Sequence, residues 1–332
     1  TEYDVDYGYD NLGRFSTVTS GTDVFTYGYL PNSNLIQSIT YPSSISVTKS
    51  YESNRDLVTS IENKYGNTTI SKYDYSNDDL GRRTSMGKSG TAFTASDSIA
   101  YGYNDKSEVT SAVAQNQNTF NYGFSFDTVG NRITSASTET GQPITNNYTT
   151  NNLNQYSLIN DGNTKTPSYD FDGNTLSNGD GWVYEYNGAN RMAKATNGTT
   201  VMEFGYDYAG REIYRKKTES GTITSHVRYA WDVMNKIEEI NALDSNIVTK
   251  KYVWGLDVSD SRRKAGGVGA LLSENNGNGA FYALYDANGN VTEYLNPSGS
   301  ISAHYEYSPF GKITVATGSS PDDFSFRYST KE

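Results

Sequence analysis

A short motif recurs along the 332-residue chain and constrains the fold more than any other feature. In each copy, aromatic residues at positions i and i+2 place two rings on the same face of an extended strand. An acidic or amide residue with a following Gly predicts a tight reversal, and an Arg or Asn then opens a second strand. Each copy therefore predicts a β-hairpin, and clear copies begin at Tyr7, Tyr73, Phe124, Tyr169, Tyr184, Tyr206 and Tyr285.

The spacing of the copies predicts how the hairpins assemble. Turn positions recur every 21 or 22 residues, first at Gly13, Asn34 and Arg55, then at Gly130, Asn152 and Gly173. A repeat of this length is typical of a quasi-one-dimensional stack, in which each unit contacts mainly its neighbours. Because a single hairpin is marginally stable in water, the units must pair edge to edge. The fold class predicted is all-β, with hairpins coiled into a β-spiral and no long helix.

The repeated residues are interpreted as structural. An acidic side chain before a turn accepts backbone amide hydrogen bonds, and a feature repeated many times in one chain is usually structural. Paired-carboxylate catalysis is the alternative. The arginines are expected to stack on tyrosines or to pair with the acids. The repeat residues are Tyr9, Asp10, Gly13, Arg14, Tyr75, Gly81, Arg82, Phe126, Asp127, Gly130, Asn131, Arg132, Tyr169, Asp172, Gly173, Asn174, Tyr206, Asp207, Tyr208, Gly210, Arg211, Tyr285, Asp286, Gly289 and Asn290.

Composition narrows the possible functions. With 29 Tyr and only 35% hydrophobic residues, tyrosine rings must supply much of the buried area. The net charge of −11 speaks against nucleic-acid binding. Cysteine is absent, which excludes disulfides, thiolate nucleophiles and Cys-type metal sites. The sequence has no apolar run of about 18 residues that could span a membrane.

The sequence motifs change after residue 225, where a second set begins. The residues that define these motifs are Trp231, Asp232, Trp254, Gly255, Asp257, Gly266, Gly267, Gly269, Tyr305, Tyr307, Pro309, Phe310 and Gly311. With these motifs in this order, the chain resembles RHS/YD-repeat proteins, a group that includes bacterial polymorphic-toxin shells, Tc toxin C-component cocoons and teneurin shells. Residues 1–225 resemble the YD-repeat array, and residues 226–332 resemble the RHS-associated core.

The resemblance implies a β-spiral that closes a hollow shell. In the family, the core usually ends in a DPxG element, where autoproteolysis frees a C-terminal toxin inside the shell. No DPxG occurs in this sequence, so cleavage and toxin release are not assigned to it. At 332 residues, the chain is expected to form part of a shell wall or a small open spiral.

The remaining motifs are better explained by structural roles than by catalysis or ligand binding. Residues 170–174 resemble a calcium loop but lack its Gly and Glu positions, so a hairpin turn is favoured. His226 and His304 lie in no catalytic motif, and Gly266–Gly269 lacks phosphate-loop spacing. Four Asn-x-Ser/Thr triplets, which begin at Asn67, Asn147, Asn197 and Asn290, are interpreted as chance occurrences. No catalytic, cofactor-binding or metal-ligating residue is predicted.

The sequence therefore predicts a non-enzymatic structural or encapsulating protein, secreted or at the cell surface. Strands are expected at both ends, over Thr1–Tyr9 and Phe324–Tyr328, and free edges could add chains head to tail into a fibre. The alternative is one wall of a cage for a toxin encoded downstream. A third possibility is carbohydrate binding through exposed aromatics. The expected partners are other protein chains, with glycans possible and no nucleic acid.

Overall fold

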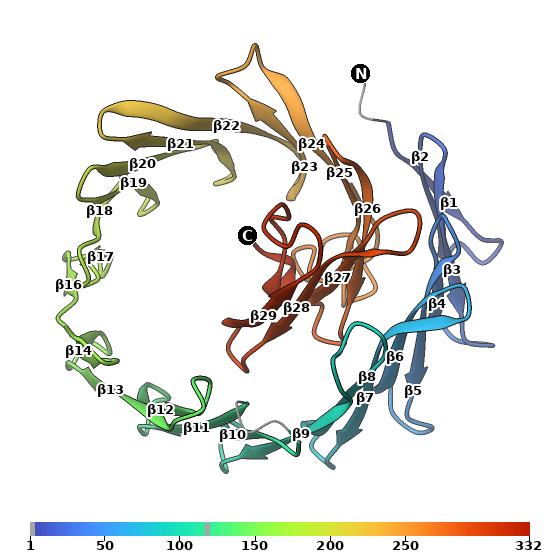
Figure 1. Ribbon diagram of the computed structural model, residues 1–332, viewed down its shortest axis with the longest axis horizontal. Coiled ribbons are helices and arrows are strands. Elements are labelled where there is room, and N and C mark those ends of the chain that lie inside the picture. The colour runs from blue at the N-terminus through green and yellow to red at the C-terminus, as the bar shows by residue number, and fades with distance from the viewer. Residues whose placement is uncertain (1–3, 117–119) are drawn as a thin grey trace.

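The computed structural model describes residues 4–116 and 120–332, and over these residues it is almost entirely β-structure (Figure 1). The described residues form 29 strands and no α-helix. One 3₁₀ helix, η1, spans Tyr328–Thr330. Among the described residues no helix is long and apolar enough to cross a membrane. The predicted all-β fold class is confirmed.

The first sheet is an antiparallel meander in which every strand pairs with the next along the chain. Such an order follows from a row of hairpins that lie edge to edge. Its strands are β1 (Asp6–Tyr9), β2 (Phe15–Ser20), β3 (Asp23–Tyr29), β4 (Ile36–Thr40), β5 (Ile45–Tyr51), β6 (Val58–Tyr65), β7 (Thr68–Asn77), β8 (Arg83–Ser89), β9 (Asp97–Tyr103), β10 (Val109–Ala114), β11 (Asn121–Phe126), β12 (Arg132–Ser137), β13 (Ile144–Thr150), β14 (Tyr156–Asn160) and β15 (Thr164–Lys165).

The second sheet continues the same meander. The two sheets are separated only by Thr166 and Pro167, and proline cannot donate to a ladder. The strands of the second sheet are β16 (Ser168–Tyr169), β17 (Thr175–Ser177), β18 (Val183–Tyr186), β19 (Met192–Asn197), β20 (Thr200–Tyr206), β21 (Glu212–Glu219), β22 (Thr222–Asp232), β23 (Asn235–Asn241), β24 (Ile247–Trp254), β25 (Leu271–Asn276), β26 (Gly279–Tyr285), β27 (Val291–Leu295), β28 (Ile301–Tyr307) and β29 (Ile313–Thr317).

The predicted boundary between residues 225 and 226 falls inside β22, where strand pairing runs on from β21 to β23. The change in motifs is therefore not accompanied by a break in the sheet at this point. A division of the chain into a repeat array and a core-like region stays a prediction.

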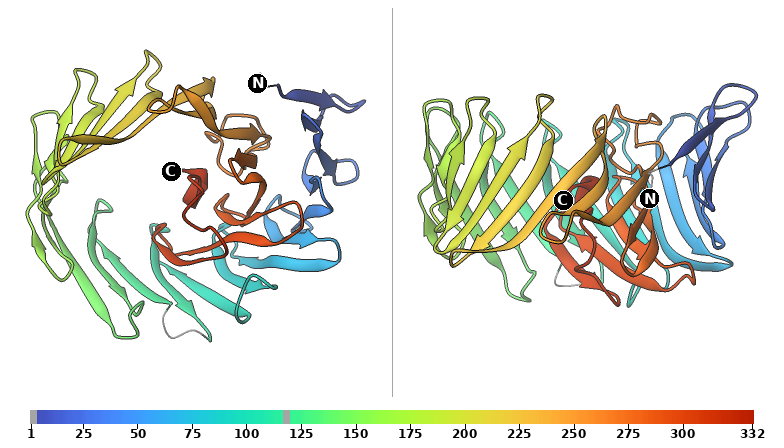
Figure 2. Two further views of the ribbon diagram at one scale, coloured as in Figure 1. Left: turned by 45° about the horizontal axis from the view of Figure 1, so that its top comes forward. Right: turned by 90° about the horizontal axis from the view of Figure 1, so that it is seen from above.

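The wall curls round until the chain overlaps itself (Figure 1). The last strands lie on the concave side of the first ones, and Figure 2 shows the same arrangement from two further directions. A buried core fills the overlap and joins residues 15–70 to residues 253–295. Within it, the Tyr41 hydroxyl donates to the Ala283 carbonyl at 3.1 Å, and Tyr27 accepts the backbone N–H of Leu256 at 3.2 Å. Tyrosines thus supply both buried area and hydrogen bonds across the overlap.

The predicted strand over Phe324–Tyr328 is wrong. This segment is irregular and leads into η1, and the last strand of the chain is β29. Alternating aromatic residues are typical of a strand, but here the Phe324 and Phe326 rings are buried in the core while their backbone pairs with no strand. Phe324 stacks on Tyr294 with ring centroids 3.9 Å apart, and Phe326 meets Trp254 edge-on at 5.2 Å. At the other end, β1 begins at Asp6, and Thr1–Tyr3 lie outside the described residues.

Candidate functional site

The repeat acids cap their own turns. Asp10 Oδ1 accepts the backbone N–H groups of Leu12 and Arg14, both at 2.9 Å, and Oδ2 accepts Arg14 Nε at 2.8 Å. Gly13 has φ +74°, the left-handed conformation that closes a three-residue hairpin loop. The backbone hydrogen bond from Arg14, with the side-chain bond beside it, holds the pKa of Asp10 below its ordinary value. The carboxylate is therefore engaged as a cap.

The same cap recurs with either Arg or Asn after the Gly. Arg211 Nε donates to Asp207 Oδ2 at 2.6 Å, whereas Asn131 and Asn290 donate through their amides to Asp127 and Asp286, each at 2.8 Å. The predicted glycines of these turns have positive φ, as does the glycine of the YEYSPFG motif. They are Gly13, Gly81, Gly130, Gly173, Gly210, Gly289 and Gly311.

One copy places the cap elsewhere than the motif suggested, and another has a cap that the list of repeat residues did not include. Asp172 lies exposed within its loop, and Asp170 makes the cap with Asn174, whose amide donates at 2.8 Å. In the copy that contains Tyr75, Asp78 is the cap, and Arg82 Nε donates to it at 2.7 Å. The capping acid is the one four residues before the Arg or Asn, because this spacing closes the three-residue loop.

In several copies a tyrosine directly before the turn joins one hairpin to the preceding one. The hydroxyls of Tyr206 and Tyr285 donate to the carbonyls of Met192 and Leu271, at 2.8 and 2.6 Å. Related bonds run from Tyr29 to Phe15, Tyr169 to Tyr156, Tyr186 to Thr175 and Tyr307 to Val291. The aromatic residue lies at a register shift in the ladder, as at Tyr9, Phe126, Tyr169, Tyr206, Tyr285 and Tyr307.

In several copies the residue that follows the turn Gly links that turn to the next. Arg14 donates to the Ser33 carbonyl at 2.7 Å, and its guanidinium lies 4.3 Å from the centre of the Tyr29 ring. Arg211 donates to the Val233 carbonyl at 2.7 Å. Asn131 reaches Asn154 Oδ1 at 3.2 Å. Tyr hydroxyls and turn cations therefore join consecutive hairpins along one rim of the wall.

Tryptophan replaces tyrosine in two of the core-like motifs. Trp231 Nε1 donates to the Glu212 carbonyl at 2.8 Å, and Trp254 Nε1 donates to the Lys236 carbonyl at 2.7 Å. Asp232 pairs with Arg263 at 2.6 Å instead of capping a turn. These tryptophans occupy the same place in the repeat as the tyrosines. Side-chain hydrogen bonds between consecutive hairpins therefore continue into the core-like region.

The glycine-rich loop of the core-like region approaches another backbone closely. Asp257 caps this loop and accepts the Ala265 N–H at 2.7 Å. A Cβ added to Gly269 would come within 3.3 Å of the Cα of Gly289. Thr330 Oγ1 accepts the Gly269 N–H at 2.7 Å and donates to the Gly289 carbonyl at 2.8 Å. The loop is therefore a packing surface for η1. Gly255, Gly266 and Gly267 belong to the same loop or the strand end before it.

One repeat turn packs against the outer wall. The turn at Asp286–Gly289 reaches strands β7 and β8, where Tyr75 accepts the Ala287 N–H at 3.0 Å. Arg83 donates to the Ala287 carbonyl at 3.0 Å and also binds Asn288. Burial raises the pKa of Asp286, although Asn290 donates hydrogen bonds to its carboxylate. A sequence motif that is exposed elsewhere thus becomes a buried contact here.

A buried chain of charged groups crosses the same overlap. His304 Nδ1 lies 2.8 Å from Glu293 Oε1, and Nε2 lies 3.6 Å from Glu306 Oε1. Glu306 pairs with Lys88 of the wall, and Ser71 donates to Glu293 at 2.7 Å. Burial alone would lower the pKa of His304, but the hydrogen bond with Glu293 and the nearby Glu306 carboxylate raise it to about 9. Below that pH we expect the imidazole to be a cation beside two carboxylates.

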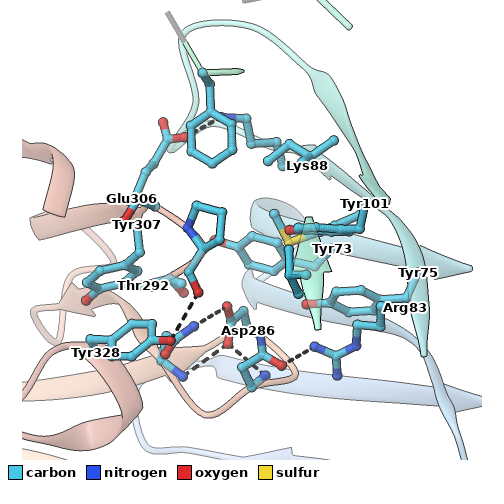
Figure 3. A pocket seen from close by; sticks show the side chains of 18 of the residues that line it. Tyr73, Tyr75, Arg83, Lys88, Tyr101, Asp286, Thr292, Glu306, Tyr307 and Tyr328 are labelled. Carbon is cyan, nitrogen blue, oxygen red and sulfur yellow. Dashed lines mark hydrogen bonds and ion pairs between the residues drawn. The ribbon is translucent and has the colours of Figure 1, made fainter. Parts of the chain in front are cut away.

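A pocket with a volume of about 410 Å³ lies beside this network (Figure 3). Wall residues Tyr73 and Tyr101 face the inner residues Tyr307 and Tyr328 across it, and Pro309 and Tyr305 also contribute to its lining. Lys88 and Glu306 at its side are paired with each other. Among the described residues, no group of three or more His, Asp or Glu is placed to hold a metal ion.

Sequence reasoning missed Glu293, Glu306, Lys88 and Arg83, and it gave His304 no role. No short motif links them, because Lys88 and Glu306 are 218 positions apart. Phe310, placed in a core-like motif, turns out to pack against Phe124 at 4.8 Å, with Arg132 4.3 Å over its ring. Only the fold brings these residues together.

Comparisons with known proteins agree on one kind of architecture. Residues 42–330 match the family model described as Teneurin YD-shell. Over 210 residues the chain is 30% identical to the tRNA3(Ser)-specific nuclease WapA of Bacillus spizizenii and 28% identical to the tRNA nuclease WapA of Bacillus subtilis strain 168. These matches cover 62% of this chain and 8% of each relative.

Solved structures show the same fold. The crystal structure of TcdB2-TccC3-Cdc42 aligns with a TM-score of 0.72 at 14% identity. That of TcdB2-TccC3 without its hypervariable C-terminal region aligns with a TM-score of 0.70 at 15% identity. Each alignment covers 99% of this chain and 19% of the other. The chain therefore corresponds to less than a fifth of these larger proteins.

Proposed function

Because the chain belongs to the teneurin YD-shell family, we propose that it is a wall segment of an encapsulating β-spiral that surrounds another stretch of polypeptide. The observation that carries this proposal is the overlap, in which strands β26–β28 lie against the concave side of the wall (Figure 2). The wall binds these strands through tyrosine hydroxyls, Arg83 and the Lys88–Glu306 pair. A wall that already holds polypeptide on its inner face is suited to enclose more of it.

The proposed role is non-enzymatic. The repeat acids are occupied as turn caps, and His304 and Glu306 are tied into ion pairs. The names of the WapA relatives describe nucleases, but the matched part is 8% of each of those proteins. We assign no catalysis to this wall.

The enclosed partner is proposed to be a protein chain, and the wall is proposed to work outside the cell. A toxin is the alternative cargo, favoured by the nuclease names of two relatives. Head-to-tail fibre growth receives less support. It would pair β1 with β29, and β29 lies inside the ring whereas β1 lies on the outer wall (Figure 1). Glycan binding has no observation in its favour beyond exposed aromatics such as Tyr208.

Protease protection tests the proposal. An unstructured reporter peptide joined after Glu332 would start within the ring, since η1 is held at the inner strands. The same reporter joined before Thr1 is the matched control. We expect the C-terminal reporter to survive limited proteolysis at least tenfold longer than the N-terminal one. Equal cleavage rates in two intact, folded fusions would contradict encapsulation.

A further inference from the structure

The turns along one rim of the wall carry exposed apolar side chains. Because neighbouring strands alternate in direction, the repeat turns all fall on the same rim (Figure 2). From the turn after β11 to the turn after β22, five of six consecutive turns expose a large apolar residue, and the sixth exposes Gly188 and Ala189. These residues, here called the apolar arc, are Val129, Leu153, Phe171, Tyr208, Val233 and Met234.

The hairpin fold does not require these side chains. The relative exposure of Phe171 is 111% and that of Tyr208 is 95%, so each stands nearly free of its own turn. The caps use Asp170 and Asp207, and the loop closure uses backbone groups and glycine. A polar side chain would serve the turn equally well and would be favoured by water. The apolar residues therefore point to a contact outside the wall.

The arc is held as a rigid row. Asn131 bonds the next turn through Asn154, and Asn174 bonds Asn190 at 3.0 Å. Arg191 donates to the Asp207 carbonyl at 3.0 Å, and Arg211 donates to the Val233 carbonyl. With neighbouring strands about 4.8 Å apart, successive tips lie roughly 10 Å from each other. Such a fixed row loses little freedom when it binds a partner.

The molecule itself shows what a turn tip of this kind packs against. Phe310 lies at the tip of the turn after β28 and reaches another part of the same sheet system, where it meets Phe124 and Arg132. Ala287, at the tip after β26, is likewise received by Tyr75 and Arg83. Both tips are thus covered by strand residues of the wall that belong to other copies of the repeat.

The size of the arc matches a protein interface. Its two aromatic residues carry about 150–250 Å² each, and the four aliphatic ones carry roughly 60–120 Å² each. The exposed total is on the order of 600–900 Å². This reaches the roughly 800 Å² that each partner buries in a standard interface.

We infer that the apolar arc is an interaction surface for a second copy of this chain, with two walls packed rim to rim about a two-fold axis. Phe171 and Tyr208 lie on either side of the turn that carries Gly188 and Ala189, and they form the centre of the contact. This interface uses turn tips and leaves the edges of β1 and β29 free. It is independent of what the wall encloses.

Sedimentation equilibrium tests this inference. The wild-type chain is expected at twice its 36.6 kDa mass at micromolar concentration. In the double variant Phe171→Ser/Tyr208→Ser, the dimer dissociation constant should rise at least about a hundredfold, or about 2.8 kcal/mol at 1.4 kcal/mol per tenfold change. The matched control is Leu243→Ser/Ile247→Ser on the opposite rim. Leu243 and Ile247 are each 51% exposed. The control variant should dimerise as the wild type does.

Several results would overturn the inference. A wild-type monomer at 100-fold higher concentration would do so, and so would a dimer that survives in the arc variant. If the control variant raised the dimer dissociation constant equally, the association would not depend on the apolar arc. Binding of the wild type to phosphatidylcholine vesicles, without dimerisation, would assign the arc to a lipid surface. Circular dichroism of both variants should match the wild type, because all four positions are exposed.

Discussion

Replacing His304 by Gln should remove a defined pH-dependent part of the stability. The folded pKa of His304 is about 9, whereas an unfolded His titrates near 6.5. A raised folded pKa contributes stability that is complete below about pH 6.5 and is lost as the pH rises through 9. The gap of about 2.5 units corresponds to roughly 3 kcal/mol. The physical source is the pair of carboxylates of Glu293 and Glu306 on either side of the ring.

Urea unfolding at pH 6 and at pH 10 measures this contribution. The groups around the imidazole are Glu293, Glu306, Lys88 and the Phe93 ring, whose centre lies 5.0 Å away. Because other groups also titrate, the informative quantity is the wild-type free energy of unfolding minus that of the variant. This difference should be about 3 kcal/mol larger at pH 6 than at pH 10.

The control is His226→Gln, since His226 packs edge-on against Tyr214 with ring centroids 5.7 Å apart. The change in the wild-type-minus-variant difference between pH 6 and pH 10 should be larger for His304→Gln than for this variant. If His304→Gln and the wild type instead lose the same free energy between pH 6 and pH 10, the imidazole is not a buried cation and the reasoning fails.

Two further pairs of variants test the turns. Asp207→Ala removes the acceptor of the Arg211 backbone N–H and should lower the midpoint of thermal or urea unfolding. Asp172→Ala, at an exposed loop position, should leave that midpoint nearly unchanged. Gly289 and Gly13 have φ +73° and +74°, but a Cβ on Gly289 would lie 2.6 Å from Val268 whereas one on Gly13 meets nothing within 4 Å. Gly289→Ala should therefore be more destabilising than Gly13→Ala by about 1–3 kcal/mol, and equal losses would contradict the close approach.

Local structure was predictable because each turn is encoded within a few residues. Asp10, Gly13 and Arg14 supply the cap, the left-handed residue and the link to the next turn from a span of five positions. The hairpins, the all-β class and the meander follow from this spacing. The capping acid in the copy near Tyr169 was misplaced by two positions, because Asp170 and Asp172 both precede the Gly.

The overlap was not predictable. Asp170 and Asp286 have nearly the same local sequence, yet the first lies on the outer wall and the second is buried against Tyr75 and Arg83. The difference depends on how far the wall has curled after more than 200 residues. The pattern of Phe324 and Phe326 suits a strand and a packed irregular segment equally well, so periodicity alone could not decide.

A zero-length carbodiimide cross-link on the unmodified chain tests the overlap most directly. Lys312 of the inner hairpin pairs with Glu139 of the outer wall, and its side chain is 69% exposed and open to reagent. The control is Lys194 and Glu185, paired at 2.8 Å between neighbouring strands. The account predicts an amide between Lys312 and Glu139, seen by mass spectrometry of the digested monomer. A Lys194–Glu185 link found without any link from Lys312 to the outer wall would contradict it.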